Sequence, residues 1–291
     1  WIGRRVSELQ DFAGRIPLLM AADEEGGRVQ RLHHVLPNLP SAARQVNERL
    51  ELVAQRAERH AVQMLELGFD VNFAPVLDVG SGPGIGDRSF SNDPSLVADY
   101  GMATIEGLSD GGVLPVVKHF PGHGSADSDS HVGRSVGPPL AQLNESDLVP
   151  FKAAISSKKI AVMVGHIEVP DLTDGLPSSL SKAAIDGLLR NDLGFDGLVV
   201  TDSLNMRSVS DRWTVDEAVV MSVAAGADLM ILGKLADVGL AFDAIDRAVH
   251  DGLISVDRVN DAATHVLRAK NVNACTLVGR VRGVLNTVYD W

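Results

Sequence analysis

Cysteine, long apolar runs and positive charge are all scarce in this sequence, and each shortage excludes a class of protein. The single cysteine, Cys275, excludes an internal disulfide framework and a cysteine-rich metal site. No apolar run approaches the length that spans a bilayer. Acidic residues outnumber Lys and Arg by 38 to 26, which gives a net charge of −12. Because phosphate groups are bound by basic surface, this charge argues against a nucleic-acid or anionic-membrane partner.

The composition is that of a soluble globular protein, with 45% hydrophobic and 22% charged residues. A chain of 291 residues can bury a large core as one α/β barrel or as two smaller domains. No proline-rich or serine-rich linker divides it, so we predict one domain over residues 1–291. The chain begins at Trp1 without a signal-like segment, and a leader or an N-terminal element could precede it. The compartment and the oligomeric state stay open.

Apolar strand segments alternate with helical patterns along the chain, which predicts an α/β fold with a parallel sheet covered on both faces. We predict six strands, over residues 16–22, 70–79, 114–117, 160–164, 197–200 and 228–232. Residues 1–2 could be the stub of another strand. The longest helical pattern, over residues 42–67, predicts one continuous helix.

Polar side chains stand at the carboxyl ends of most of these strands. They are Asp23, Asp78, Lys118, His119, His166 and Asp202. In a barrel these ends converge on one face, which is the active-site face, whereas a flat sheet would spread them along an edge. The pattern therefore favours a (β/α)8-like TIM barrel, although only six strands can be counted.

The segment from residue 116 to 131 carries most of the ionisable side chains. Its strand turns polar at Lys118 and His119, and Pro and Gly residues then end regular structure. The loop that follows holds His123, Asp129 and His131. Ionisable groups on a loop at the carboxyl end of a strand are typical of α/β enzymes, so we interpret this loop as part of an active site.

Two other interpretations of these regions are possible. His119, His123, Asp129 and His131 could bind a metal, but the run lacks a recognised ligand spacing. The glycine-rich loop at residues 80–86 resembles the nucleotide-binding loop of S-adenosylmethionine-dependent methyltransferases. In those enzymes a helix starts at once and the next strand ends in an acidic residue. Neither feature is present here, so both interpretations are secondary.

Several motifs together resemble one known family. The motifs are Lys118 to Gly124 with Asp129-Ser130-His131, Asp23 to Arg31, Phe73 to Val79, Asp87 to Phe90, and Leu193 to Gly197 continuing through Thr201-Asp202-Ser203-Leu204 and Met206. They resemble glycoside hydrolase family 3, and most closely its bacterial exo-β-N-acetylglucosaminidases, which trim peptidoglycan fragments. The resemblance extends nearly to Leu232. The family's first barrel strand would precede Ile2, and the segment after Lys270 matches nothing in the family.

The resemblance implies a barrel of the (β/α)8 type and a retaining, two-step mechanism without a cofactor or metal. Asp202 matches the nucleophile that forms a glycosyl-enzyme intermediate. His131 matches the acid/base, oriented by Asp129. This chemistry is sensible, because an imidazole can donate and accept a proton near pH 7 and a neighbouring carboxylate fixes its ring.

By the same matching, five side chains would hold the sugar of a small carbohydrate substrate. They are Asp23, Arg31, Arg88, Lys118 and His119. Arg88 could reach the carbonyl oxygen of a 2-acetamido group or could instead hold its own loop, and Arg31 could be a surface ion pair. We expect Asp78 and His166 to support the site. The glycines at residues 26–27 and 80–86 would serve backbone shape alone.

Alternatives to a hydrolase remain at this point. A histidine acid/base repels phosphate less than a carboxylate does, which leaves a β-N-acetylglucosaminide phosphorylase open, as well as a β-glucosidase of the same family. A sugar-binding protein without activity is disfavoured by the intact Asp202, Asp129 and His131. The protein could act in the bacterial cytoplasm or at the cell envelope.

The loop over residues 120–131 is also expected to move. Its run of small residues, 125–130, offers no large apolar side chain to anchor it. A segment with little buried surface cannot offset its conformational entropy, so we predict that it is mobile or displaced without ligand. His131 would then reach the glycosidic oxygen when the loop closes over bound sugar.

Overall fold

Six parallel strands form the central sheet of the computed structural model, which describes residues 1–13, 16–157 and 160–272. In sheet order they are β1 (Ala21–Ala22), β4 (Val71–Asn72), β5 (Leu114–Phe120), β7 (Ala161–Val164), β9 (Val199–Ser203) and β10 (Leu229–Ile231). Neighbours in the sheet are also neighbours in the chain, and every pair is parallel. The six predicted strands and their parallel arrangement are confirmed.

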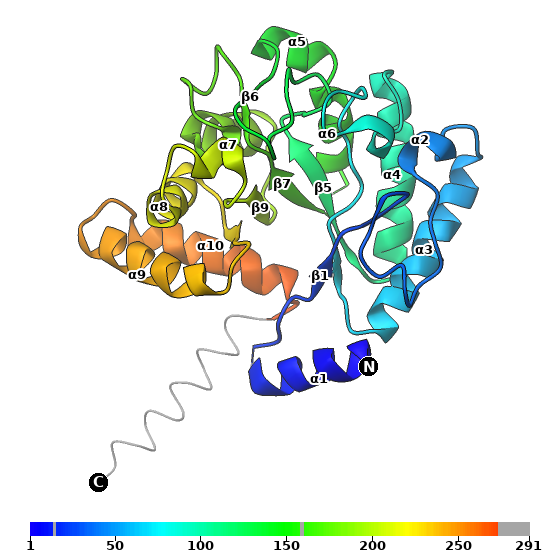
Figure 1. Ribbon diagram of the computed structural model, residues 1–291, viewed down its shortest axis with the longest axis horizontal. Coiled ribbons are helices and arrows are strands. Elements are labelled where there is room, and N and C mark those ends of the chain that lie inside the picture. Colours follow the sequence, from blue (N-terminus) through cyan, green and yellow to red (C-terminus); the bar gives the residue numbers. More distant parts are fainter. Residues whose placement is uncertain (14–15, 158–159, 273–291) are drawn as a thin grey trace.

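The sheet curls into a barrel-like α/β fold, with its helices on the outside (Figure 1). Within the described ranges the sheet has six strands, and β1 and β10 are its two edges. The strand suggested for residues 1–2 is wrong, because these residues lead into α1 (Ile2–Ala13). Val6 is buried in this helix and lies against Gly68, and Ile2 packs against the same apolar cluster as Leu67 and Phe69. Apolar residues at helical spacing therefore place the start of the chain in a helix, and not in the strand that its two apolar residues suggested.

Helices follow the strands in the order expected of repeated βα units. They are α2 (Ala42–Gln45), α3 (Leu50–Glu66), α4 (Pro94–Asp110), α5 (Leu140–Glu145), α6 (Leu148–Ile155), η3 (Ala183–Asp192, a π-helix), α7 (Arg207–Ser210), α8 (Val215–Ala225), α9 (Ala236–His250) and α10 (Val256–Ala269). The 3-10 turns η1 (Gly86–Arg88) and η2 (Ser178–Leu180) are short. β2 (Glu24–Gly26) pairs with β3 (Val29–Gln30), and β6 (Ser135–Val136) pairs with β8 (Ile167–Glu168). No helix in these ranges is long and apolar enough to cross a membrane.

The single long helix predicted for residues 42–67 is wrong, because α2 and α3 are separate. Tyr100 of α4 explains the break. Its hydroxyl lies 2.5 Å from the carbonyl oxygen of Val46 and 2.7 Å from that of Glu48. The two carbonyls share the single hydroxyl hydrogen as acceptors outside a helix. The local pattern could not predict this, because the aromatic side chain lies some fifty residues away in the sequence.

Helix ends follow the local sequence more closely. Thr214 and Glu217 form a capping box at the start of α8, and Gly226 ends this helix with φ 115°. Asp93 accepts a hydrogen bond from the backbone N–H of Ser95 at the start of α4. The strand predicted over residues 70–79 is shorter than expected, since only β4 and an isolated bridge between Val76 and Lys118 are paired. Pro75 lacks the N–H that a continuous ladder would need.

Candidate active site

The carboxyl ends of the strands surround a cleft of about 820 Å³. All eight side chains that were expected to act on or hold a substrate line this cleft. They are Asp23, Arg31, Arg88, Lys118, His119, Asp129, His131 and Asp202. Ionisable groups from five separate regions of the chain are therefore brought to one place, as the barrel interpretation predicts.

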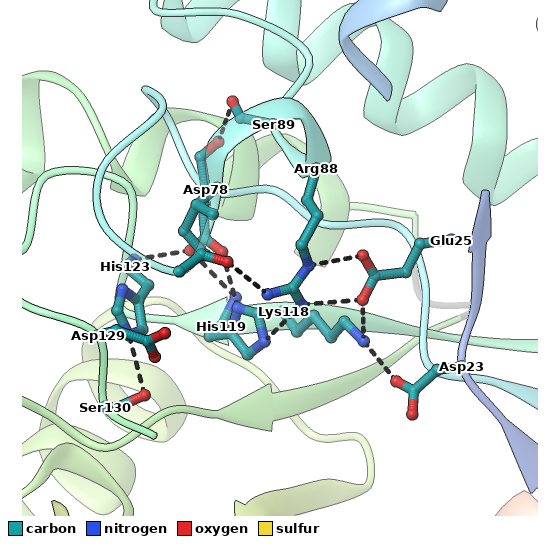
Figure 2. Close-up of polar contacts among 12 residues, drawn as sticks. Asp23, Glu25, Asp78, Arg88, Ser89, Lys118, His119, His123, Asp129 and Ser130 are labelled. Carbon is teal, nitrogen blue, oxygen red and sulfur yellow. Dashed lines mark hydrogen bonds and ion pairs between the residues drawn. The ribbon is translucent and has the colours of Figure 1, made fainter. Parts of the chain in front are cut away.

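A network of alternating charges lies along one wall of the cleft (Figure 2). Nζ of Lys118 lies 2.7 Å from Oδ1 of Asp23 and 2.6 Å from Oε1 of Glu25. The guanidinium group of Arg88 contacts both oxygens of Glu25, with Nε at 2.8 Å and Nη2 at 2.9 Å. Burial raises the pKa of Glu25, but the charges and hydrogen bonds of Lys118 and Arg88 lower it by a larger amount, so that the pKa falls to about 2. Glu25 is therefore an anion that keeps both buried cations charged.

Glu25 was not among the predicted site residues. The signal that could have found it is the alternation of a strand, which points Asp23 and Glu25 to one side and Glu24 to the other. The structure shows this division, because Glu24 turns away from the cleft and its Oε2 lies 2.9 Å from Nε2 of the buried His60.

Asp78 orients His119 from below the cleft. Its Oδ2 lies 2.7 Å from Nδ1 of His119, and its Oδ1 accepts the backbone N–H of His123 at 2.7 Å. Burial raises the pKa of Asp78, but the nearby imidazole of His119 lowers it more, to about 2. An ionised Asp78 accepts a hydrogen bond from Nδ1–H of His119, which leaves Nε2 of His119 beside the cleft and 3.4 Å from Nη2 of Arg88. These contacts agree with the support role expected of Asp78.

Asp202 is the next-to-last residue of β9, and its Oδ1 accepts the backbone N–H of Ser203 at 2.7 Å. Burial raises the pKa of this carboxyl group, whereas the nearby His119 and His166 lower it, and the net direction is downward. His166 is fully buried and fixes the same strand end, since its Nε2 lies 2.9 Å from the carbonyl oxygen of Ser203. Its Nδ1 lies 2.7 Å from Oγ of Ser179. Asp202 is thus an anion held at the end of a strand whose backbone His166 positions.

Asp129 and His131 form a pair on the loop after β5. Nδ1 of His131 lies 2.8 Å from Oδ1 of Asp129, and the same oxygen accepts the backbone N–H of His131 at 2.9 Å. Hydrogen bonds from His131 hold the pKa of Asp129 below its ordinary value, against the opposing effect of partial burial, which is the largest single contribution. The side chain of His131 is 60% exposed. The expected Asp-x-His pair is present, with the imidazole at the mouth of the cleft.

The glycine-rich loop at residues 80–86 lets this histidine loop approach closely. A Cβ at Gly82 would lie 2.4 Å from the carbonyl oxygen of Gly124. Gly84 has φ 82°, and a Cβ there would lie 2.7 Å from Cγ of Asp129. Only glycine fits at such distances and dihedral angles. The expectation that these glycines serve backbone shape agrees with this packing.

The histidine loop, residues 120–131, is anchored to the protein, although it has no large apolar side chain between residues 125 and 130. Ala126 and Ser130 are buried, and Oγ of Ser130 lies 2.9 Å from Nε2 of the buried His123. Oγ of Ser125 donates to Asp147 at the start of α6, at 3.1 Å. Small side chains are anchored here through hydrogen bonds rather than through apolar area. The mobility of the loop stays a prediction.

The metal interpretation has no geometric support among the described residues, where no three His, Cys, Asp or Glu side chains are grouped as metal ligands. Two of the four side chains considered for it pair with each other, and His123 contacts Ser130. His119 contacts Asp78, and His131 contacts Asp129.

Comparisons with known proteins agree with the geometry. The family described as "Glycosyl hydrolase family 3 N terminal domain" matches residues 4–269. The chain belongs to glycosyl hydrolase family 3. It is 40% identical over 279 residues to a protein named beta-hexosaminidase LpqI from Mycobacterium tuberculosis, covering 92% of this chain and 72% of the relative. A beta-hexosaminidase from Xylella fastidiosa is 39% identical over 225 residues, which cover 74% of this chain and 67% of that protein.

Solved structures give the same family 3 assignment. The structure of M. tuberculosis LpqI has a TM-score of 0.90 at 40% identity, over 94% of this chain and 82% of that chain. A family 3 β-N-acetylglucosaminidase from Paenibacillus has a TM-score of 0.89 at 37% identity, over 93% of this chain and 53% of that chain. The methyltransferase interpretation is therefore not favoured. The loop at residues 80–86 leads into a 3-10 turn, and its glycines pack against the histidine loop of a family 3 domain.

Proposed function

We propose that this chain is the single catalytic domain of a retaining exo-β-N-acetylglucosaminidase, which removes terminal β-linked N-acetylglucosamine. The observation that carries the proposal is that Asp202 and the pair of Asp129 and His131 line the same cleft. The names of the relatives, beta-hexosaminidase and β-N-acetylglucosaminidase, support the substrate class. The motifs shared with peptidoglycan-trimming enzymes support peptidoglycan fragments as the natural substrate.

His131 would act as the acid and then as the base. Because the ionised Asp129 accepts a hydrogen bond from Nδ1–H of His131, Nε2 is the nitrogen that exchanges a proton with the substrate. Asp129 also stabilises the imidazolium form. One histidine can thus serve both steps, with a carboxylate as its orienting group.

Asp202 would act as the nucleophile. In the first step, its carboxylate attacks the anomeric carbon while imidazolium His131 gives its proton to the glycosidic oxygen, and the aglycone leaves as an alcohol. In the second step, neutral His131 takes a proton from water, the water oxygen bonds to the anomeric carbon, and the bond to Asp202 breaks. The lowered pKa of Asp202 keeps the carboxylate ionised for the attack.

The charged wall of the cleft would bind the sugar. Asp23 has a partly exposed carboxylate to accept hydrogen bonds from hydroxyl groups. Lys118 and His119 flank the same space. The guanidinium group of Arg88 is mostly occupied by Glu25 and by the carbonyl oxygen of Gly84, 3.2 Å from Nη1. It therefore holds its own loop and would donate to an acetamido oxygen through its remaining N–H groups.

Arg31 lies at the rim of the cleft. Its Nε is 4.0 Å from Oδ2 of Asp23, and its side chain is 67% exposed. This distance is at the limit for an ion pair, so Arg31 is available to a sugar hydroxyl and we keep it among the binding residues.

The test is hydrolysis of 4-nitrophenyl β-N-acetylglucosaminide compared with the matching β-glucoside. A site that pairs a buried polar group with the acetamido oxygen should reject the analogue without it, by as much as about 10⁴-fold in kcat/KM. Comparable rates would assign the chain to a glucosidase. The same assay with inorganic phosphate separates the phosphorylase, since only that reaction yields a sugar 1-phosphate.

A further inference from the structure

Ser130 stands between Asp129 and His131, yet it differs from both in its surroundings. Its exposed fraction is 2%, while the side chain of His131 is 60% exposed. The middle residue of this triplet is therefore packed into the protein, and its two neighbours reach the cleft. Ser130 is therefore one of the buried residues, with His123 and Ala126, that fix this loop.

Two hydrogen bonds connect Ser130 to separate parts of the site. Its Oγ lies 2.9 Å from Nε2 of His123, and its carbonyl oxygen accepts the backbone N–H of Ser208 at 3.2 Å. His123 is itself held by Asp78, which orients His119. Ser208 belongs to α7, which follows β9, the strand that contains Asp202. Ser130 thus connects the loop of the acid/base to the nucleophile's segment and to the sugar-binding wall.

The imidazole of His123 is neutral and carries its proton on the nitrogen that faces Ser130. Burial lowers the pKa of His123, which favours the neutral ring. Within the described part of the chain, Nδ1 of His123 is buried without a hydrogen-bond partner. We assign the ring proton to Nε2, because a buried N–H donor without an acceptor is rarer in proteins than a buried acceptor without a donor. His123 therefore donates to Oγ of Ser130.

We propose that Ser130 is a positioning residue for the acid/base, which sets the place of His131 over the cleft through its bonds to His123 and Ser208. This inference rests on the proposed function, because it assigns the position of the group that protonates the leaving alcohol. Misplacement of a catalytic group by about 1 Å can cost about 10²-fold in rate. The loss should fall on the step that needs the acid.

The experiment compares leaving groups in Ser130→Ala. For hydrolysis of the N-acetylglucosamine disaccharide, whose leaving alcohol needs protonation, we expect kcat/KM to fall about 10- to 100-fold. For the 2,4-dinitrophenyl glycoside, which hardly needs it, kcat/KM should stay within about threefold. The control is Ser128→Ala in the same loop, since among the described residues Oγ of Ser128 bonds to Asp127 and to the carbonyl oxygen of the nearby Arg134, and not to His123 or Ser208. This control should keep the leaving-group dependence of the wild type.

His123 gives a second, independent pair of variants should Ser130→Ala fail to fold. His123→Gln keeps an N–H donor near the place of Nε2, and His123→Leu removes it. We expect the leucine variant alone to lose activity selectively on the disaccharide. Equal slowing on both substrates, or none, in the folded Ser130 or His123 variants would overturn the positioning role. Failure of the proposed function would look different, since His131→Ala would then show no dependence on the leaving group.

Discussion

Lys118 and Glu25 form a buried ion pair at the centre of the cleft wall, with 2.6 Å between Nζ and Oε1. The side chains are 2% and 5% exposed. Glu25 also carries the bidentate contact with Arg88, so one carboxylate contacts two cations, and Asp23 is a second partner of Lys118. Buried charges are tolerated only when they are paired, and removing one partner leaves the other uncompensated. The position of Lys118 and Arg88 in the cleft therefore depends on Glu25.

We predict that Glu25→Gln lowers the free energy of unfolding by about 3 kcal/mol at pH 7. The pKa of Glu25 is depressed to about 2 in the folded protein. Its contribution is therefore complete above the unfolded pKa near 4.5 and is lost as the pH falls through about 2. Urea titrations at several pH values measure this. The difference in the free energy of unfolding between wild type and variant should shrink steadily below pH 4.5.

The control for this prediction is Glu8→Gln on α1. Glu8 pairs with Arg4 and Arg5 at the surface, where its side chain is 46% exposed. Such exposed pairs contribute about 0 to 1 kcal/mol. A similar loss of unfolding free energy in both variants would show that burial of the Glu25 network does not increase its contribution to stability.

For Asp147 we predict a pH dependence of stability with the opposite sign to that of Glu25. It is buried under the histidine loop, and burial raises its pKa to about 6. Between its ordinary pKa of 3.8 and about 6, the folded protein holds a proton that the unfolded chain has lost. Stability contributed by this proton is present at low pH and is lost as the pH rises through that window. Asp147→Asn, which stays neutral, should remove this decrease of stability with pH. Its free energy of unfolding at pH 7 should be about 2 to 3 kcal/mol higher than that of the wild type.

Thermal or urea unfolding at pH 4 and pH 7 checks the Asp147 prediction. Asp110→Asn, at the exposed end of α4, is the control and should leave the slope unchanged. An Asp147 variant with the slope of the wild type would mean that Asp147 is already ionised at pH 4. Its hydrogen bond with Ser125 would then hold the loop as a charged group.

Local pattern was enough to predict the strands and the polar residues at their ends. Apolar runs that stop at Asp78, Lys118 or Asp202 define both the sheet and the face that carries the site. The break between α2 and α3 could not be predicted, because it depends on the hydroxyl of the distant Tyr100. The anchoring of Ser130 also depends on a partner chosen by the fold. Features that rest on periodicity are local, whereas buried polar pairings are decided by tertiary packing.

Asp202 offers a matched test of the nucleophile. Asp202→Ala should abolish turnover, because no glycosyl-enzyme can form, while the strand end keeps its fold. Asp196 lies just before the same strand, is 85% exposed and serves as the control. Asp196→Ala should keep near-normal kcat and KM. Turnover by Asp202→Ala at a near-normal rate would exclude Asp202 as the nucleophile.

His131 decides whether one histidine performs both proton transfers. In His131→Ala, substrates with a good leaving group should form the glycosyl-enzyme almost normally, because their leaving oxygen hardly needs a proton. Substrates with a sugar aglycone should slow by about 10² to 10⁴. Steady-state kinetics with an aryl glycoside series and the disaccharide measure the difference.

The second step of the same variant gives an independent readout. Without a base, water attacks the glycosyl-enzyme slowly, so the intermediate should accumulate with good leaving groups. Azide is a nucleophile that needs no deprotonation, and it should restore turnover and release the β-glycosyl azide from Asp202. Asp129→Asn should weaken both steps less than His131→Ala, because the imidazole remains while its orienting charge is lost. Equal slowing for all leaving groups without an azide response would exclude His131 as the acid/base and assign its loop another role.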